Sequence, residues 1–273
     1  MTDSPAPRRV TPRLWAALTL AGAAGSAAAS PALVPLPITG GPERLWQVQT
    51  QAGEGGEGGE SGAATADDAA ATLDYLTELG QIEAQLRAAA ALADAGQSAG
   101  AEAHLDIADE IYSEIEPELE SFGGTGLTEP LAEAGASIKD GTGVAEALAA
   151  ALAEFDTARD HARAPDAVQG AAIVALLRAA ADSYATGVAG GALGDPAAYR
   201  QAWGLAETAR HLVGRMAEAD DEKERTFAGK ALEAMADLSA VLPAIDPKGQ
   251  ALGDPSIPAA VAARVELAAY QLR

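Results

Sequence analysis

The sequence predicts an all-α protein built as an antiparallel helical bundle. Hydrophobic residues make up 48% of the chain but aromatic residues only 4%, and much of the apolar content is alanine, the strongest helix former. From Thr65 to the C-terminus the apolar positions follow a helical spacing, and no stretch of useful length alternates as a β-strand does. Because an alanine side chain buries little area, such a core requires many packed helices rather than a few bulky anchors.

Residues 1–29 have the three parts of a secretory signal peptide. Three arginines within the first 13 residues form a basic start, Leu14–Gly22 is a short apolar run, and Ala27–Ala29 supply small residues for cleavage before Ser30. The apolar run is too short to span a bilayer comfortably, and no later segment is long and apolar enough to do so. We therefore expect an exported, soluble mature protein with no membrane span, located in a bacterial periplasm.

Residues 30–64 are expected to form an extended arm and a linker. Four prolines between residues 31 and 42 resist helix formation. The segment Gly53–Gly62 that follows is rich in glycine and glutamate, which is typical of a flexible linker. A phosphate-binding loop is excluded here because the acids would repel phosphate and no Lys-Ser/Thr pair follows.

Glycine and proline divide the rest of the chain into eight predicted helices. Asp67 or Asp68 can cap the first of them, and Pro196 after Asp195 suits the first position of a later one. Pro117 lies inside the second helix, where it is expected to kink or shorten the last turn. The predicted helices span residues 67–95, 98–121, 128–139, 144–163, 166–189, 196–218, 222–242 and 257–272.

A short internal repeat bears on the number of bundles. The segment Leu86–Ala90 recurs as Leu177–Ala181, and each copy lies in a predicted helix followed by a glycine-containing turn and another helix. A duplication would give two related bundles, residues 65–164 and 165–273. Coincidence in an alanine-rich chain explains the similarity equally well, so one bundle and two bundles both remain open.

The net charge of −22 restricts the classes of partner. It disfavours nucleic acid and anionic membrane surfaces, which attract basic patches. It suits a protein that attracts cations, although acidity can also serve solubility alone. The absence of cysteine excludes thiol catalysis, thiolate metal sites and disulfides. Serine-nucleophile, zinc-hydrolase, Rossmann and Walker motifs are missing too, so the protein is not predicted to be an enzyme.

The acidic run from Asp106 to Phe122 is the strongest concentration of potential ligands in the chain. Helical spacing places its isoleucines on one stripe and several of its acids on a neighbouring stripe. Glu110 and Glu114 are one turn apart, so both carboxylates can converge on a hard cation. A solvated acidic face is the alternative interpretation. The candidate metal ligands are Glu110, Glu114 and Glu116, with Asp106 or His104 assisting. Tyr112 would orient a carboxylate or add a phenolic ligand.

The same run carries a family resemblance. Tyr112-Ser113-Glu114-Ile115-Glu116-Pro117, followed by Glu120-Ser121-Phe122, resembles a segment of the imelysin-like group, which includes the EfeO-type periplasmic iron-uptake proteins. The match covers Ala95 to Gly123, and the group's Gly-x-His-x-x-Glu metal motif is absent. The resemblance implies an exported helical fold that binds iron or another hard metal ion through Tyr112, Glu114 and Glu116.

Two functions follow from these observations. The first is a non-enzymatic periplasmic protein that binds a hard metal ion, or a partner in metal uptake, through the acidic helix. The second is a structural or adaptor bundle without a ligand that holds another envelope protein, in which case an exposed apolar helix face carries the activity.

Overall fold

The computed structural model describes residues 66–123 and 126–273. The chain divides into two compact units, residues 1–54 and 55–273, and all the described residues belong to the second unit. The signal peptide, arm and linker predicted for residues 1–64 therefore lie outside the described residues.

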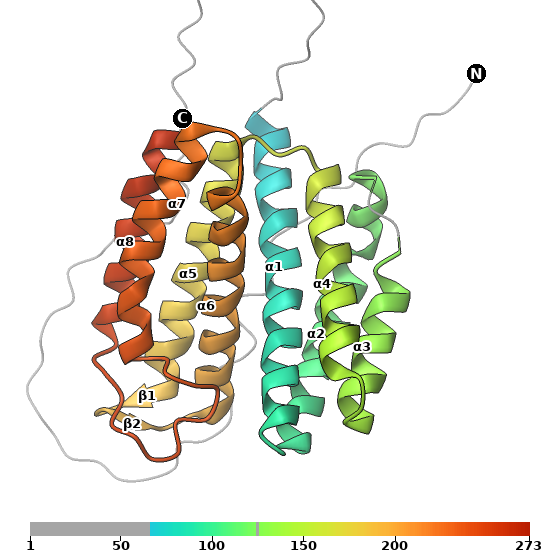
Figure 1. Ribbon diagram of the computed structural model, residues 1–273, viewed down its shortest axis with the longest axis vertical. Helices are drawn as coiled ribbons and strands as arrows, with labels where there is room; N and C mark the ends of the chain where they lie inside the picture. Colours follow the sequence, from blue (N-terminus) through green and yellow to red (C-terminus); the bar gives the residue numbers. More distant parts are fainter. Residues whose placement is uncertain (1–65, 124–125) are drawn as a thin grey trace, which may run out of the picture. The chain divides into compact units, whose positions relative to one another are not determined.

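The all-α prediction is confirmed, because the described part of the chain forms eight α-helices and one very short β-hairpin (Figure 1). No helix among the described residues is both long and apolar enough to cross a bilayer. The elements in chain order are α1 (Ala66–Asp94), α2 (Ser98–Ser121), α3 (Thr128–Asp140), α4 (Val144–His161), α5 (Asp166–Gly187), β1 (Val188–Ala189), β2 (Ala192–Leu193), α6 (Pro196–Ala217), α7 (Glu222–Met235) and α8 (Ser256–Ala269).

The helix boundaries lie close to the predicted ones, since the chain's turn signals act locally. Gly96 has a φ of 72° and ends α1, and the carboxylate of Asp195 accepts hydrogen bonds from the backbone N–H groups of Ala197 and Ala198 at the start of α6. Asp67 and Asp68 are not caps, because α1 already begins at Ala66 and both lie in its first turn.

Helix α2 contains Pro117 and continues to Ser121, the predicted end, so the proline does not shorten it, and the alternative of a kink stays a prediction. Two other local predictions were wrong. The helix predicted for residues 166–189 ends at Gly187, where Val188–Ala189 pairs with Ala192–Leu193 across the two glycines 190 and 191, both at positive φ. The helix predicted for residues 222–242 becomes a 3₁₀ turn after Met235. Tertiary packing decides these ends more than local propensity does.

Two hydrophobic cores form, one mainly from α1–α4 and one mainly from α5–α8, and α1 links them (Figure 1). Helix α1 packs against α2 and α4 on one side and against α5 and α6 on the other. Ala84 of α1 belongs to the second core, Ala172 of α5 belongs to the first, and Trp203 packs against both. The division into two related bundles stays a prediction. Helix α1 packs against helices on both sides of the predicted boundary.

Helices α1 and α6 cross in backbone contact at Gly204. A Cβ atom at this position would lie 2.3 Å from the carbonyl oxygen of Ala84 and 3.4 Å from the Cβ of Ala88. The first distance is far below van der Waals contact, and the obstacle is backbone that cannot rotate away. The small residues at this crossing therefore set how closely the two helices approach.

We expect Gly204→Ala to lower the free energy of unfolding by about 2–3 kcal/mol, because α1 and α6 must separate to admit the methyl group. Gly214→Ala on the same helix is the matched control, since nothing lies within 4 Å of its would-be Cβ. It should raise stability by about 0.5–1 kcal/mol through helix propensity. Urea unfolding followed by circular dichroism measures both, and equal effects of the two substitutions would contradict the close contact.

Candidate functional site

A buried carboxylate lies at the centre of the helix that links the two cores. Glu83 of α1 is fully buried, and its Oε1 accepts a hydrogen bond from Nη2 of Arg87, one turn further along, at 2.6 Å. Its Oε2 accepts a hydrogen bond from Nη2 of Arg159, on α4. A buried carboxylate is stable only when it is paired and hydrogen-bonded, so these arginines are required partners.

The ion pairs continue from α4 to α6. Nη1 of Arg159 lies 3.2 Å from Asp156, and Arg215 of α6 donates to Asp156 at 3.1 Å and to Asp160 at 2.8 Å. Nε2 of His211 lies 3.2 Å from Oδ2 of Asp156. Burial raises the pKa of the Asp156 carboxyl, but the contact with His211 and the charges of the two arginines outweigh it and hold the pKa below its ordinary value. One network thus connects α1, α4 and α6.

We expect Glu83→Gln to lower the free energy of unfolding by about 3 kcal/mol or more, because it leaves buried Arg159 without its closest counter-charge. Glu266→Gln is the matched control, since Glu266 pairs with Arg178 across half-exposed side chains. That substitution should change stability by about 0.5 kcal/mol at most. Denaturant unfolding at low and high salt compares the two, and a loss for Glu83→Gln no larger than for Glu266→Gln would contradict the role of the buried pair.

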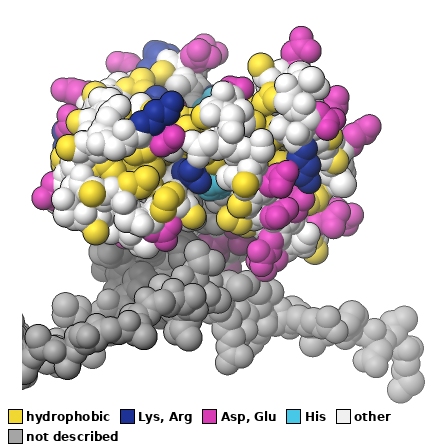
Figure 2. Space-filling view, turned by 90° about the horizontal axis from the view of Figure 1, so that it is seen from below, with side chains coloured by type: hydrophobic (Ala, Val, Ile, Leu, Met, Phe, Trp, Pro, Cys, Tyr) yellow, Lys and Arg dark blue, Asp and Glu magenta, His cyan; other side chains and the backbone are white. Residues whose placement is uncertain are grey.

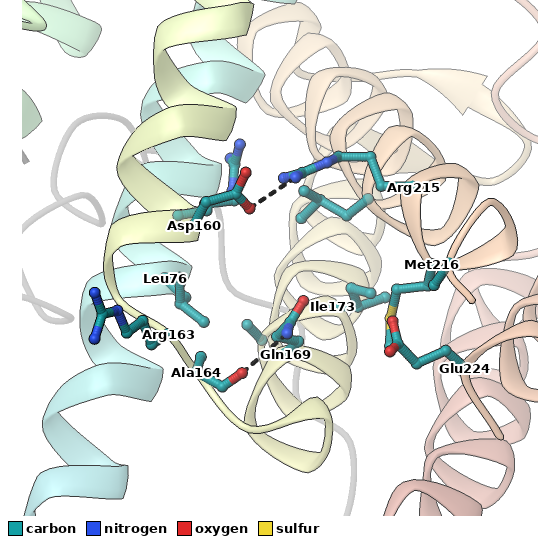
Figure 3. A pocket seen from close by; sticks show the side chains of 13 residues that line it. Leu76, Asp160, Arg163, Ala164, Gln169, Ile173, Arg215, Met216 and Glu224 are labelled. Carbon is teal, nitrogen blue, oxygen red and sulfur yellow. Dashed lines mark hydrogen bonds and ion pairs between the residues drawn. The ribbon is translucent and has the colours of Figure 1, made fainter. Parts of the chain in front are cut away.

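A cavity of about 320 Å³ opens beside this network (Figure 3). Its walls come from α1, α4, α5, α6 and the start of α7. Part of the lining is apolar, and the remainder carries three arginines, two acids and one amide. The lining residues are Leu76, Arg159, Asp160, Arg163, Ala164, Gln169, Ala172, Ile173, Leu212, Arg215, Met216, Ala219 and Glu224. A hollow of this size with convergent polar groups is typical of a site for a small organic molecule.

Arg159, which lines the cavity, carries one buried donor without a hydrogen-bond partner. Arg159 is only 8% exposed, and its Nε–H has no hydrogen-bond partner, whereas both of its Nη atoms are paired. Only one other buried side-chain atom in the described part of the chain, Oγ1 of Thr208, also lacks a partner. An unmade hydrogen bond at a buried donor is costly, so each such group requires an explanation. The Nε atom of Arg159 is closed off from solvent, so its unmade bond reflects the packing of the network and not a contact open to a ligand in the cavity.

The residues of the predicted metal site lie apart from this cavity, on α2. Asp106, Glu110, Glu114 and Glu116 are all exposed. The hydroxyl of half-buried Tyr112 lies 2.7 Å from Oγ1 of Thr128, so it faces α3 rather than a carboxylate of α2.

His104, which was expected to assist the acids of α2, points the other way. It is 4% exposed, and its Nδ1 lies 2.5 Å from Oε1 of Gln85 on α1. Burial, reinforced by the charge of Arg200, lowers the pKa of His104 to about 4. His104 is therefore a neutral packing residue at pH 7. No group of three histidine, aspartate or glutamate side chains within residues 66–123 and 126–273 is placed to hold a metal ion. Metal binding by α2 remains a prediction from the sequence.

The acidity of the protein is concentrated on one side of it. Residues 66–164 carry 21 acidic and 4 basic side chains, whereas residues 165–273 carry 14 and 10. Figure 2 shows the larger gathering of acidic side chains on the right, over α1–α4. Helix α2 alone contributes eight acids and no basic residue. The acids of α2 are exposed and belong to this acidic surface, whereas three arginines line the cavity.

One carboxyl at the contact of α1 and α2 is forced toward its neutral form. Burial raises the pKa of Glu78 to about 7, and the charges of Glu118, Asp74 and Glu114 add to the effect. The folded protein therefore holds this proton more tightly than the unfolded chain does. Stability from this group is complete below about pH 4.5 and is lost as the pH rises through about 7.

We expect Glu78→Gln to stabilise the protein by about 1–2 kcal/mol at pH 8, after allowance for solvent screening, and to have little effect at pH 4. Exposed Glu110→Gln on α2 is the control and should change stability by less than about 0.5 kcal/mol at both pH values. Melting temperatures across this pH range measure the effect, and a stabilisation by Glu78→Gln that does not grow with pH would contradict it.

The charge network and the cavity were both missed by sequence reasoning. Sequence reasoning took His211 as a surface or packing residue and assigned no role to Arg159. The pairings visible from spacing are the local ones, Glu83 with Arg87 and Asp156 with Arg159. Glu83 and Arg159 are 76 residues apart, and Asp156 and Arg215 are 59 apart. The only signal for this network and cavity in the sequence was the pair Arg159 and Arg163 near the C-terminus of α4.

No protein-family model matches the chain. The comparison with curated proteins finds no significant match, and neither does the comparison with solved structures. The resemblance to the imelysin-like group therefore stays a prediction, and function has to be argued from the site.

Proposed function

We propose that this protein is an exported, non-enzymatic binding protein and that its ligand is a small organic molecule held in the cavity between α1, α4, α5, α6 and α7. The observation that carries the proposal is the cavity itself, whose lining combines apolar side chains with Arg159 and Arg215, two arginines that the ion-pair network holds in place. The signal-peptide features of residues 1–29 support export.

The walls of the cavity support a preformed site. Arg159 and Arg215 are held by Glu83 of α1 and by Asp156 and Asp160 of α4, so their positions do not depend on a ligand. Preorganised donors bind more tightly because less ordering is required on association. The apolar side chains between them offer a surface for the body of an organic molecule. These features favour an organic ligand in the cavity over a hard metal ion on α2.

An adaptor function is the second candidate, and a different surface favours it. Leu267 and Tyr270 of the C-terminal helical segment are 71% and 54% exposed, and their spacing of three places them on one side of it. Exposed apolar residues of this size are candidates for protein contact. An adaptor would lose its partner on Leu267→Glu but keep it when the cavity is filled. A ligand-binding protein would show the opposite pattern.

The test is a thermal-shift screen of the mature chain, beginning at Ser30, against small carboxylates, amines, amphoteric molecules and uncharged molecules. A ligand present at 100 times its Kd stabilises the folded state by about 2.7 kcal/mol. We expect at least one class to raise the melting temperature saturably with one site per chain. Ala219→Trp should abolish the effect by filling the cavity from its rim, whereas Ala175→Trp, outside the cavity lining, should not. If no class stabilises the protein, or if Ala219→Trp leaves binding intact, the proposal fails.

A further inference from the structure

The side-chain amide of Gln169 is held in one orientation at the cavity wall. Gln169 of α5 is half-buried and lines the cavity, and its Nε2 donates a hydrogen bond to the carbonyl oxygen of Ala164 at 3.0 Å. Only the nitrogen end of an amide can donate to a carbonyl, so this bond fixes the position of the oxygen end. Figure 3 shows Oε1 on the side away from Ala164, directed between Leu76 and Ile173.

This oxygen is an accessible acceptor that no donor reaches. Gln97 and Gln271 also donate through Nε2, and in each of them Oε1 accepts a hydrogen bond from an arginine or a lysine side chain. Among the described residues, Gln169 is the one glutamine that donates through Nε2 and has no hydrogen bond at Oε1. Unlike the Nε atom of Arg159, its Oε1 is not closed off from solvent. A molecule in the cavity can therefore donate a hydrogen bond to it.

The charges at the cavity favour a ligand without a net charge. The guanidinium of Arg163 points away from the cavity (Figure 3), which leaves Arg159 and Arg215 on the positive side and Asp160 and Glu224 on the negative side. The two arginines are already ion-paired. An ionised ligand would lose its hydration here without meeting a net counter-charge, and that loss is costly.

Resting on the proposed function, we propose that the ligand is an uncharged molecule with an apolar body and a hydroxyl or amide N–H group that donates a hydrogen bond to Oε1 of Gln169. Leu76 and Ile173, which flank this oxygen, are buried apolar residues of the lining and would contact the body of the ligand. An ether of the same size has no donor and would leave the oxygen unpaired. Gln169 is then the residue that determines specificity.

Calorimetric titration of the mature chain tests the proposal with 1-hexanol, its isomer 1-methoxypentane, hexanoate and hexylamine. We expect 1-hexanol to bind about 5-fold more tightly than 1-methoxypentane, because it alone of the two can donate a hydrogen bond. The two ions should bind about 10-fold or more weakly than 1-hexanol, because of their lost hydration.

Three outcomes of this titration would overturn the inference. Equal affinity for 1-hexanol and 1-methoxypentane would show that Gln169 selects no donor. Tightest binding of hexanoate or hexylamine would show a charged ligand but, if Ala219→Trp abolished that binding, would leave the proposed function standing. No binding by any of the four probes would remove this ligand class, and the broader screen would then decide the function.

Two glutamine substitutions separate recognition from folding. In Gln169→Met, affinity for 1-hexanol should fall about 5-fold, to that of 1-methoxypentane, while affinity for the ether stays the same. Gln271→Met is the matched control, since Gln271 also donates to a backbone carbonyl at 3.0 Å but lies outside the cavity lining, and it should change neither affinity. If Gln169→Met weakened both probes equally, or left 1-hexanol binding unchanged, the inference would be wrong.

Discussion

The pairing of buried Glu83 with Arg159 is the interaction on which the arrangement of the helices depends. A carboxylate with no solvent exposure cannot remain charged without a cation from another element, and α4 supplies that cation. Arg159 in turn is balanced by Asp156, which Arg215 of α6 shares. The helices bury large side chains such as Tyr75, Phe155 and Tyr199 as well as alanine, so apolar packing already constrains how they approach. The ion pairs between α1, α4 and α6 add a directional constraint on their register.

The close contact of α1 with α6 and the presence of the cavity have a common cause. Where the helices carry small residues at their crossing, as at Gly204 and Ala84, the backbones meet directly. Just beyond the C-termini of α4 and α6 lie Ala164 and Ala219, and these side chains are too short to fill the space between them. Protein interiors are normally close-packed, so an unfilled space of about 320 Å³ at a junction of five helices is unusual. Small residues thus produce both the close contact between α1 and α6 and the open space at the cavity.

Most of the fold could be predicted from local signals, and most of the site could not. Helix ends follow from glycine at positive φ, from Asp195 as a cap and from proline at first positions, all of which act within a few residues. The hairpin at Val188 was missed because two-residue strands leave no periodic pattern. The acids of α2 were correctly placed on one helix, but spacing along a helix does not reveal whether a neighbouring helix supplies further ligands. His104 shows this directly, since its partner, Gln85, lies on another helix.

The charges at the cavity differ from those elsewhere in how completely they are satisfied. Glu83, Asp156, Arg159 and Arg215 form a network in which each buried charge meets an opposite one, as stability requires. Arg163 and Glu224 also line the cavity without an ion pair to another described residue, but the guanidinium of Arg163 points away from it (Figure 3). The cavity wall therefore depends on the completed ion pairs, so a ligand would meet arginines that are already fixed in position.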